Sequence, residues 1–342
     1  MLEFLLNVII LVIGFAIILK SADIFIDKIS LVAKSLGISE FIIGLTMVAF
    51  GTSVPELVSS VIASLKGSSQ LALGNLVGSN ITNLGLILGI TGMISVVKIN
   101  SHIIKRDGYL MLLSSVIFYL FTVSFELSRI EAIFLILMYL AYLLFLFKEK
   151  KIFDTDFFED YLNFFINFEF LSVLKQTNHN HNHHKHKVVI KDIILSIISL
   201  AFVVLGANLV VDKSLWMART IGVTEGFIGY TLVALGTTLP EMSVSITAAK
   251  KGKGDIALGN ILGSNIVNIL FILSISALIA PISFSNFTKF FVAPFLLFIS
   301  FLLIWFIHKK NRLMRWQGAV MFGLYILFIL ISSANQVFHF IK

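Results

Sequence analysis

The feature that most constrains this chain of 342 residues is a series of apolar stretches, each long enough to cross a lipid bilayer. A membrane-spanning helix needs about 20 predominantly apolar residues. The composition agrees, because 58% of the residues are hydrophobic and 13% are charged, with a mean hydropathy of +0.97. Soluble domains are less apolar than this. The sequence therefore predicts an all-α integral membrane protein.

The apolar stretches form two sets of five, separated by a polar interval. The first set covers residues 4–19, 41–65, 71–97, 108–123 and 130–147, and the second covers 193–211, 227–249, 256–279, 290–307 and 318–331. We expect one transmembrane helix from each stretch, and therefore about ten helices. The chain has no cysteine, which excludes disulfides and thiolate metal sites.

The distribution of Lys and Arg predicts how the chain is oriented in the membrane. Cytoplasmic loops carry an excess of these residues. If the amino terminus lies outside, 20 of the 26 Lys and Arg residues fall in inside loops. We therefore expect a multi-pass protein of the cell membrane, with both termini outside and the central loop in the cytoplasm. The net charge of +7 is then mainly a topology signal and requires no nucleic-acid partner.

An internal repeat relates the two sets of stretches. The sequence GISEFIIGLTMVAFGTSVPE, from Gly37, aligns without a gap on GVTEGFIGYTLVALGTTLPE, from Gly222. The same offset of 185 positions places LALGNLVGSNITN on IALGNILGSNIVN. We expect a first five-helix repeat at 1–147, a cytoplasmic loop at 148–191 and a second five-helix repeat at 192–342. The segments that align with each other are 37–90 in the first repeat and 222–275 in the second. Because five is odd, the second repeat should be inverted, which usually places a substrate site at the midplane.

Each repeat segment places a helix breaker beside an acid. Pro55 cannot donate a backbone hydrogen bond, and Gly51 relaxes the backbone, so we expect a break or kink between Ala49 and Pro55. Such backbone is tolerated at membrane depth only where it is buried in protein or lines a wet cavity. The oxygen-bearing side chains Thr52, Ser53 and Glu56 surround the break, and their counterparts in the second repeat are Thr237, Thr238 and Glu241. Hard oxygen ligands suit calcium or sodium.

The functional interpretation competes with a structural one at several of these positions. An ionisable residue near the bilayer centre costs about 2.5 to 3.5 kcal/mol on insertion scales, so we expect Glu56 and Glu241 to be functional. The glycines of both segments can instead serve close helix packing; they are Gly74, Gly78, Gly259 and Gly263. For Asn83 and Asn268, the alternative to an ion ligand is a hydrogen bond between helices.

The motifs GTSVPE with GSNITN, repeated as GTTLPE with GSNIVN, resemble the two alpha-repeats of the calcium/cation antiporter superfamily, most closely its prokaryotic sodium/calcium exchanger branch. The resemblance implies a ten-helix antiporter that exchanges about three sodium ions for one calcium ion by alternating access. The implied ion ligands are the backbone carbonyls of Ala49 and Ala234, the hydroxyls of Thr52, Ser53, Ser79, Thr237, Thr238 and Ser264, the carboxylates of Glu56 and Glu241, and the amides of Asn83 and Asn268. No cofactor is expected, because calcium and sodium are the transported ions.

Other functions stay open at this point. Potassium-dependent relatives carry Asp at the position of Asn268, and proton-coupled relatives typically show Gly-Asn-x-x-Glu around the acid, so the sequence favours sodium without excluding protons. A channel is a further alternative, because breaks in membrane helices also build pores. The spans contain no HExxH motif and no Ser with Lys or His, so we do not expect an enzyme.

The central loop holds two further patterns. The string NHNHNHHKHK contains His179, His181, His183, His184 and His186, which are suitable ligands for zinc, nickel or copper. We expect weak transition-metal binding at most, and a solvated linker is the alternative. The preceding string FDTDFFEDYLNFF predicts an amphipathic segment at the membrane surface.

Overall fold

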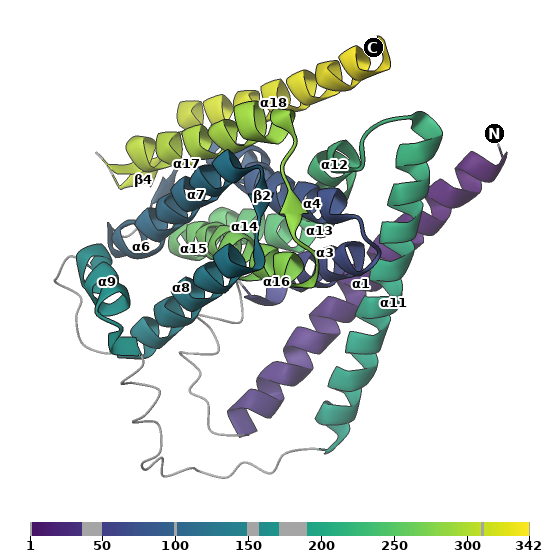
Figure 1. Ribbon diagram of the computed structural model, residues 1–342. Helices are drawn as coiled ribbons and strands as arrows, with labels where there is room; N and C mark the ends of the chain where they lie inside the picture. Colours follow the sequence, from purple (N-terminus) through teal and green to yellow (C-terminus); the bar gives the residue numbers. More distant parts are fainter. Residues whose placement is uncertain are drawn as a thin grey trace.

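The computed structural model describes residues 2–35, 50–98, 101–148, 157–170, 190–308 and 311–341, and these residues form a bundle of helices (Figure 1). The helices of the first half are α1 (Leu2–Ser35), α3 (Val54–Leu65), α4 (Ser69–Ile81), α5 (Leu88–Ile94), α6 (Ser101–Ile103), α7 (Tyr109–Phe121), α8 (Arg129–Lys148) and α9 (Phe157–Ile166). Those of the second half are α11 (Ile190–Ile221), α12 (Glu225–Ile228), α13 (Ala234–Thr237), α14 (Leu239–Lys250), α15 (Gly254–Val267), α16 (Leu273–Ile279), α17 (Ala293–His308) and α18 (Arg315–Ile341).

Short helical turns of other types connect several of these helices. The π-helical turns are η1 (Thr82–Ile87), η2 (Ile104–Gly108), η4 (Gly229–Val233), η5 (Asn268–Ile272) and η6 (Thr288–Val292), and η3 (Thr122–Ser124) is a 3-10 turn. Each π-helical turn continues directly into an α-helix, so η1 joins α4 to α5 and η5 joins α15 to α16. These turns interrupt the regular hydrogen bonding of long spans, a feature that is frequent at functional sites.

The predicted helical class is confirmed. Eight helical segments of the described residues are long and apolar enough to cross a membrane, and a bent pair, Glu225–Thr237 with Leu239–Lys250, makes a ninth if it counts as one span. These nine coincide with nine of the ten apolar stretches of the sequence. The tenth, 41–65, is described only from residue 50 onward, where α3 continues it. The number of ten helices therefore stays a prediction.

The helices of the two halves recur at the offset found in the sequence. Val54–Leu65 and Leu239–Lys250 differ by 185 positions at both ends, and so do Leu88–Ile94 and Leu273–Ile279. The two central spans, Ser69–Ile94 and Gly254–Ile279, are each 78% buried, whereas the windows in α1 and α11 are 33% buried. The repeated segments thus form the interior of the bundle, and the first helix of each half lies at its periphery.

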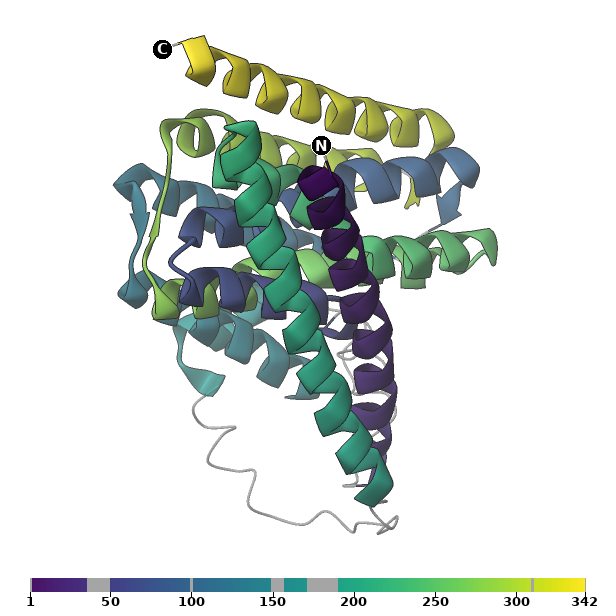
Figure 2. The same cartoon turned by 90° about the vertical axis from the view of Figure 1, so that its right-hand side faces the viewer.

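Helices α1 and α11 run side by side, inclined to the other helices, as both views show (Figures 1 and 2). They approach closely at two glycines. A Cβ atom on Gly14 would lie 3.2 Å from the carbonyl oxygen of Gly206, and one on Gly206 would lie 3.0 Å from that of Gly14. Small residues of this kind let membrane helices pack backbone to backbone.

Two pairs of very short strands join the halves. Strand β1 (Val97–Lys98) pairs with β4 (Arg312–Leu313), and β2 (Glu126–Leu127) pairs with β3 (Ile282–Ser283), both antiparallel. Each pair takes one strand from either half. Because the span Ile104–Ser124 separates β1 from β2, the two pairs lie at different ends of that helix.

Helix α9 is the described part of the central loop. Its Tyr161 hydroxyl donates to the carbonyl of Met138 at 3.0 Å, and the rings of Phe157 and Phe145 lie 4.8 Å apart between centroids. The aromatic side of the amphipathic segment therefore packs on α8, while its place at the membrane surface stays a prediction. The histidine string, 178–187, lies outside the described residues.

Candidate ion-binding site

The break predicted beside each acid is present where the structure describes it. Thr238 separates α13 from α14 with φ −81° and ψ 4°, and the segments on its two sides differ in direction by 49°. Its counterpart Ser53 has φ −86° and ψ 6° and directly precedes α3. Proline stands in the first turn of both following helices, where its missing N–H costs least. The break therefore starts two short helices whose first turns carry Glu56 and Glu241.

The two acids meet in the interior of the bundle. Glu56 and Glu241 are each 0% exposed, and they lie near enough for their charges to repel. Ser53 and Ser264 donate to Oε1 of Glu241, at 3.4 and 3.3 Å. Within the part of the chain that the structure describes, Oε2 of Glu241 and both carboxylate oxygens of Glu56 have no hydrogen-bond partner. Buried carboxylate oxygens without partners are costly and suit a cation.

Hydroxyl groups from both halves surround the acids in a matching arrangement. Ser79 and Thr237 lie beside Glu56, and Ser264 and Thr52 lie beside Glu241. Each carboxylate is therefore flanked by one serine of its own half and one threonine of the other half. Thr52 also lies 3.3 Å from the hydroxyl of Ser264. The predicted hydroxyl ligands are thus brought together, with one exception.

The exception is Thr238, which differs from its counterpart Ser53. Its hydroxyl donates to the carbonyls of Ala234 and Leu235, at 2.9 and 3.2 Å, whereas Ser53 reaches across to Glu241. The carbonyl of Ala234 also accepts from the amide of Thr238 at 3.1 Å. In this conformation the carbonyl of Ala234, a predicted ligand, accepts hydrogen bonds from the residue that ends its own helix. Its counterpart Ala49 lies outside the described residues.

Two asparagines hold the broken helices in place and were missed in the sequence. Asn75 donates to the hydroxyl of Ser60 at 2.9 Å and accepts from Thr237 at 3.0 Å. Asn260 repeats this in the other half, donating to Ser245 at 3.1 Å and accepting from Thr52 at 3.3 Å. Each asparagine therefore ties one repeat to the other. The signal was available, because the pattern Gly-Asn-x-x-Gly-Ser-Asn occurs in both repeats.

Four more asparagines cross-link α4 with α15 and the turns η1 and η5 that follow them. Asn83 donates to Oδ1 of Asn265 and Asn268 donates to Oδ1 of Asn80, both at 2.9 Å. Within the described residues, the Oδ1 atoms of Asn83 and Asn268 have no hydrogen-bond partner. The helix-to-helix hydrogen bond that competed with the ligand interpretation is therefore present, and the amide oxygens are still free for an ion.

The glycines of the first segment serve close packing, as the structural interpretation predicted. A Cβ atom on Gly74 would lie 2.8 Å from the Cα of Gly229, and one on Gly78 would lie 2.6 Å from the Cα of Tyr230. For Gly259, nothing among the described residues lies within 4 Å of such an atom. Packing against glycine thus brings α4 into contact with η4.

The chemistry of the assembled site is that of oxygen ligands for hard cations. Two carboxylates lie among neutral hydroxyl and amide oxygens, the set that sodium and calcium prefer. The described ranges contain no group of three or more His, Cys, Asp and Glu residues that could hold a metal ion. The oxygen ligands of the assembled site come from both repeats.

Comparisons with known proteins agree with this chemistry. The family described as "Sodium/calcium exchanger protein" matches residues 6–148 and 191–334. The chain is 40% identical to the sodium/calcium exchanger MaX1 of Methanosarcina acetivorans, over 95% of this chain and 98% of that protein. It is 33% identical to the inner membrane protein YrbG of Escherichia coli, over 79% of each.

A solved structure is also similar over nearly the whole chain. It is that of the sodium-calcium exchanger NCX_Mj soaked with 100 mM Na+ and 10 mM Sr2+. The match has a TM-score of 0.61 at 29% identity, and it covers 96% of this chain and 98% of the other.

Proposed function

Because this chain belongs to the sodium/calcium exchanger family, we propose that it is an antiporter that moves calcium against sodium across the cell membrane. The observation that carries the proposal is the pair of buried carboxylates, Glu56 and Glu241, set among neutral oxygens from both repeats. Two negative charges balance one calcium ion. The same oxygens can take sodium ions in its place, which is the requirement for exchange at a shared site.

Exchange at a shared site needs alternating access, and the two repeats provide matching motions for it. In our proposal the second repeat is inverted relative to the first, so that a motion exposing the site to one face has a counterpart exposing it to the other. The odd number of apolar stretches in each repeat supports this arrangement. Both termini would lie outside and the central loop in the cytoplasm.

The ligand set also predicts that exchange is electrogenic. Charge balance at the two carboxylates would allow two sodium ions, whereas the proposed stoichiometry is about three sodium ions for one calcium ion. The third ion would use hydroxyl and amide oxygens, among them the free Oδ1 atoms of Asn83 and Asn268. One net positive charge then moves with sodium in each cycle. Moving one charge across about 100 mV is worth about 2.3 kcal/mol, so the membrane potential should shift the exchange equilibrium.

The decisive experiment measures calcium flux in proteoliposomes under sodium, potassium or proton gradients, each imposed separately. We expect flux to follow the sodium gradient, and to respond when valinomycin clamps the potential at fixed sodium. Flux that ignores the potential would indicate exchange of two sodium ions for one calcium ion. Flux that follows pH and ignores sodium would instead establish a proton-coupled calcium antiporter.

Asn268→Asp tests the ligand role of the amide and the potassium-dependent alternative. The aspartate adds a negative charge, so we expect altered ion selectivity with folding retained. It also loses the hydrogen bond to Asn80, which should cost about 0.6 to 1.7 kcal/mol of stability. Flux assays with sodium, potassium and calcium varied in turn measure the selectivity, and Asn83→Asp is the matched variant in the other repeat. A loss of thermal stability with unchanged selectivity would make Asn268 a structural clamp only.

A further inference from the structure

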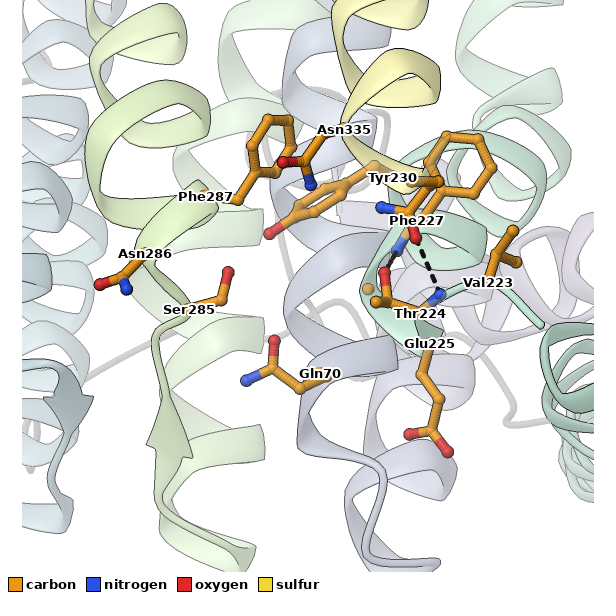
Figure 3. A pocket seen from close by; sticks show the side chains of 12 residues that line it. Gln70, Val223, Thr224, Glu225, Phe227, Tyr230, Ser285, Asn286, Phe287 and Asn335 are labelled. Carbon is orange, nitrogen blue, oxygen red and sulfur yellow. Dashed lines mark hydrogen bonds between the residues drawn. The ribbon is translucent and has the colours of Figure 1, made fainter. Parts of the chain in front are cut away.

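A cavity of about 790 Å³ lies beside Tyr230, and Figure 3 shows the side chains that line it. It is bounded by the first residues of α4, by the segment that begins α12, by the loop before η6 and by α18 near its end. Its lining includes the side chains of Gln70, Glu225, Tyr230, Ser285 and Asn286. In the proposed topology all of these segments lie at the outer face.

The lining of the cavity is mostly apolar but includes several polar side chains. Gln70, Asn286 and Asn335 contribute amides, and Glu225 is the one carboxylate among the lining residues. Ser68 donates to Oε2 of Glu225 at 2.5 Å. The amide of Thr224 donates to the side chain of Gln336 at 3.0 Å, which ties the start of α12 to α18 (Figure 3). The lining thus combines an apolar surface with amides and one carboxylate, which are groups that a hydrated cation can contact.

Tyr230 forms the inner wall of the cavity. Its side chain is 4% exposed, and its hydroxyl lies 2.8 Å from that of Thr288 in η6. Thr288 is held in turn by the hydroxyl of Ser285 at 3.0 Å. The tyrosine ring packs edge-on against Phe328, with 6.3 Å between centroids. The hydrogen bond therefore connects η4 to η6 across the inner end of the cavity.

The backbone of this tyrosine packs against α4, the helix that carries Ser79 of the candidate ion site. The backbone of Tyr230 packs against Gly78, the neighbour of Ser79, so closely that a Cβ atom there would lie 2.6 Å from the Cα of Tyr230. One turn further along the chain stands Ala234, which begins α13. Tyr230 thus connects the wall of the cavity to the helices that carry Ser79 and Thr237.

We propose that this cavity is the mouth of one ion route, and that the hydrogen bond between Tyr230 and Thr288 is the latch that closes it. The inference rests on the proposed exchange function and adds an asymmetry to it. By the sequence offset, Leu45 and Ile103 occupy the equivalent positions of the first repeat, and neither has a hydroxyl group. A latch made by hydroxyl groups therefore serves the route at this face alone.

The test first identifies the face to which the cavity opens. Because the chain has no cysteine, Asn286→Cys provides a single thiol in the lining, and a membrane-impermeant maleimide labels it from that face in oriented vesicles. Half-saturating calcium is then measured separately at each face in wild type and in Tyr230→Phe. Losing the latch favours the open state at the labelled face, so half-saturating calcium should fall there by about two- to tenfold and rise at the other face. The equilibrium coupling of sodium to calcium should not change.

Two further variants make the test specific. Thr288→Val removes the other half of the latch, so it should produce the same shift, and combining it with Tyr230→Phe should add little. Tyr161→Phe is the matched control, because it removes a buried tyrosine hydroxyl that donates to Met138, and it should leave both faces unchanged.

Three outcomes would overturn the latch: no labelling of Asn286→Cys, no shift in folded Tyr230→Phe and Thr288→Val, or equal shifts at both faces. Failure of the exchange function itself is distinguishable, because wild type would then show no sodium-driven calcium flux.

Discussion

The two repeats are nearly identical around the acids and differ toward the ends of the bundle. Glu56, Asn75 and Ser79 in the first repeat have identical counterparts in Glu241, Asn260 and Ser264. Toward the ends the residues at equivalent positions differ, because Tyr230 and Thr288 of the second repeat correspond to Leu45 and Ile103 of the first. In the proposed exchanger, residues that must treat an ion alike from both faces are duplicated, whereas residues that act at one face are free to differ.

The first repeat has a buried polar cluster of its own. Arg106 makes two hydrogen bonds to Asp107, at 2.7 and 2.8 Å, and Tyr142 donates to Asp107 at 2.7 Å. The offset places Phe291, Val292 and Leu327 at the corresponding positions of the second repeat, so this cluster has no duplicate. We therefore expect it to stabilise one half of the fold and to take no part in ion binding.

The largest expected effect comes from neutralising either acid. Glu56→Gln or Glu241→Gln removes one of the two charges that compensate calcium, which should weaken calcium binding about a hundredfold or more and abolish exchange. Because the acids are equivalent, both variants should fail alike while their expression is retained. Calcium flux in proteoliposomes measures the effect, and Glu126→Gln, at an exposed position in β2, is the control. Near-normal exchange in either acid variant would refute the site assignment.

An intermediate effect is expected from the asparagines that tie the repeats together. Asn75→Ala leaves the hydroxyls of Ser60 and Thr237 without this partner, and Asn260→Ala does the same to Ser245 and Thr52. Each substitution should lower stability by about 1 to 3 kcal/mol, and the two losses should be similar. Apparent melting temperatures of the purified variants measure this.

A much larger loss of stability in one of these two asparagine variants than in the other would contradict the equivalence of the repeats at these positions. Asn208→Ala is the matched control, because the exposed amide of Asn208 bonds only locally, to the carbonyl of Val204 one turn earlier in α11. It should change stability little.

Most of the helical architecture followed from apolar stretches, because crossing a bilayer demands long helices whatever their partners are. The internal repeat predicted which helices of the two halves correspond. The bounds of Val54–Leu65 and Leu239–Lys250 agree with that prediction. What hydropathy could not indicate is lateral packing. The side-by-side course of α1 and α11 depends on contacts such as those of Gly14 and Gly206, which no periodicity reveals.

The candidate site was predictable where a residue is unusual by itself. An acid beside a proline in an apolar stretch is conspicuous, so Glu56 and Glu241 were identified at once. Asn75 and Asn260 were missed although they recur in both repeats, because the repeat does not show which residues of another helix they bind. The same reason hid Tyr230, whose role depends on Thr288, 58 positions away.

The smallest expected effect concerns the unduplicated cluster and sharpens the contrast between the halves. Tyr142→Phe removes one hydrogen bond to Asp107 but leaves both contacts from Arg106, so stability should fall by only about 0.5 to 1.5 kcal/mol. Half-saturating calcium should be unchanged at both faces, since Tyr142 belongs neither to the ion site nor to the latch. Leu327→Ala, at the position of α18 that the offset matches to Tyr142, is the control, because Leu327 is exposed and its truncation should change stability little. A change in calcium affinity in Tyr142→Phe, at either face, would show that a residue outside the ion site and the latch takes part in ion binding, and the separation of this cluster from the ion-binding residues would have to be abandoned.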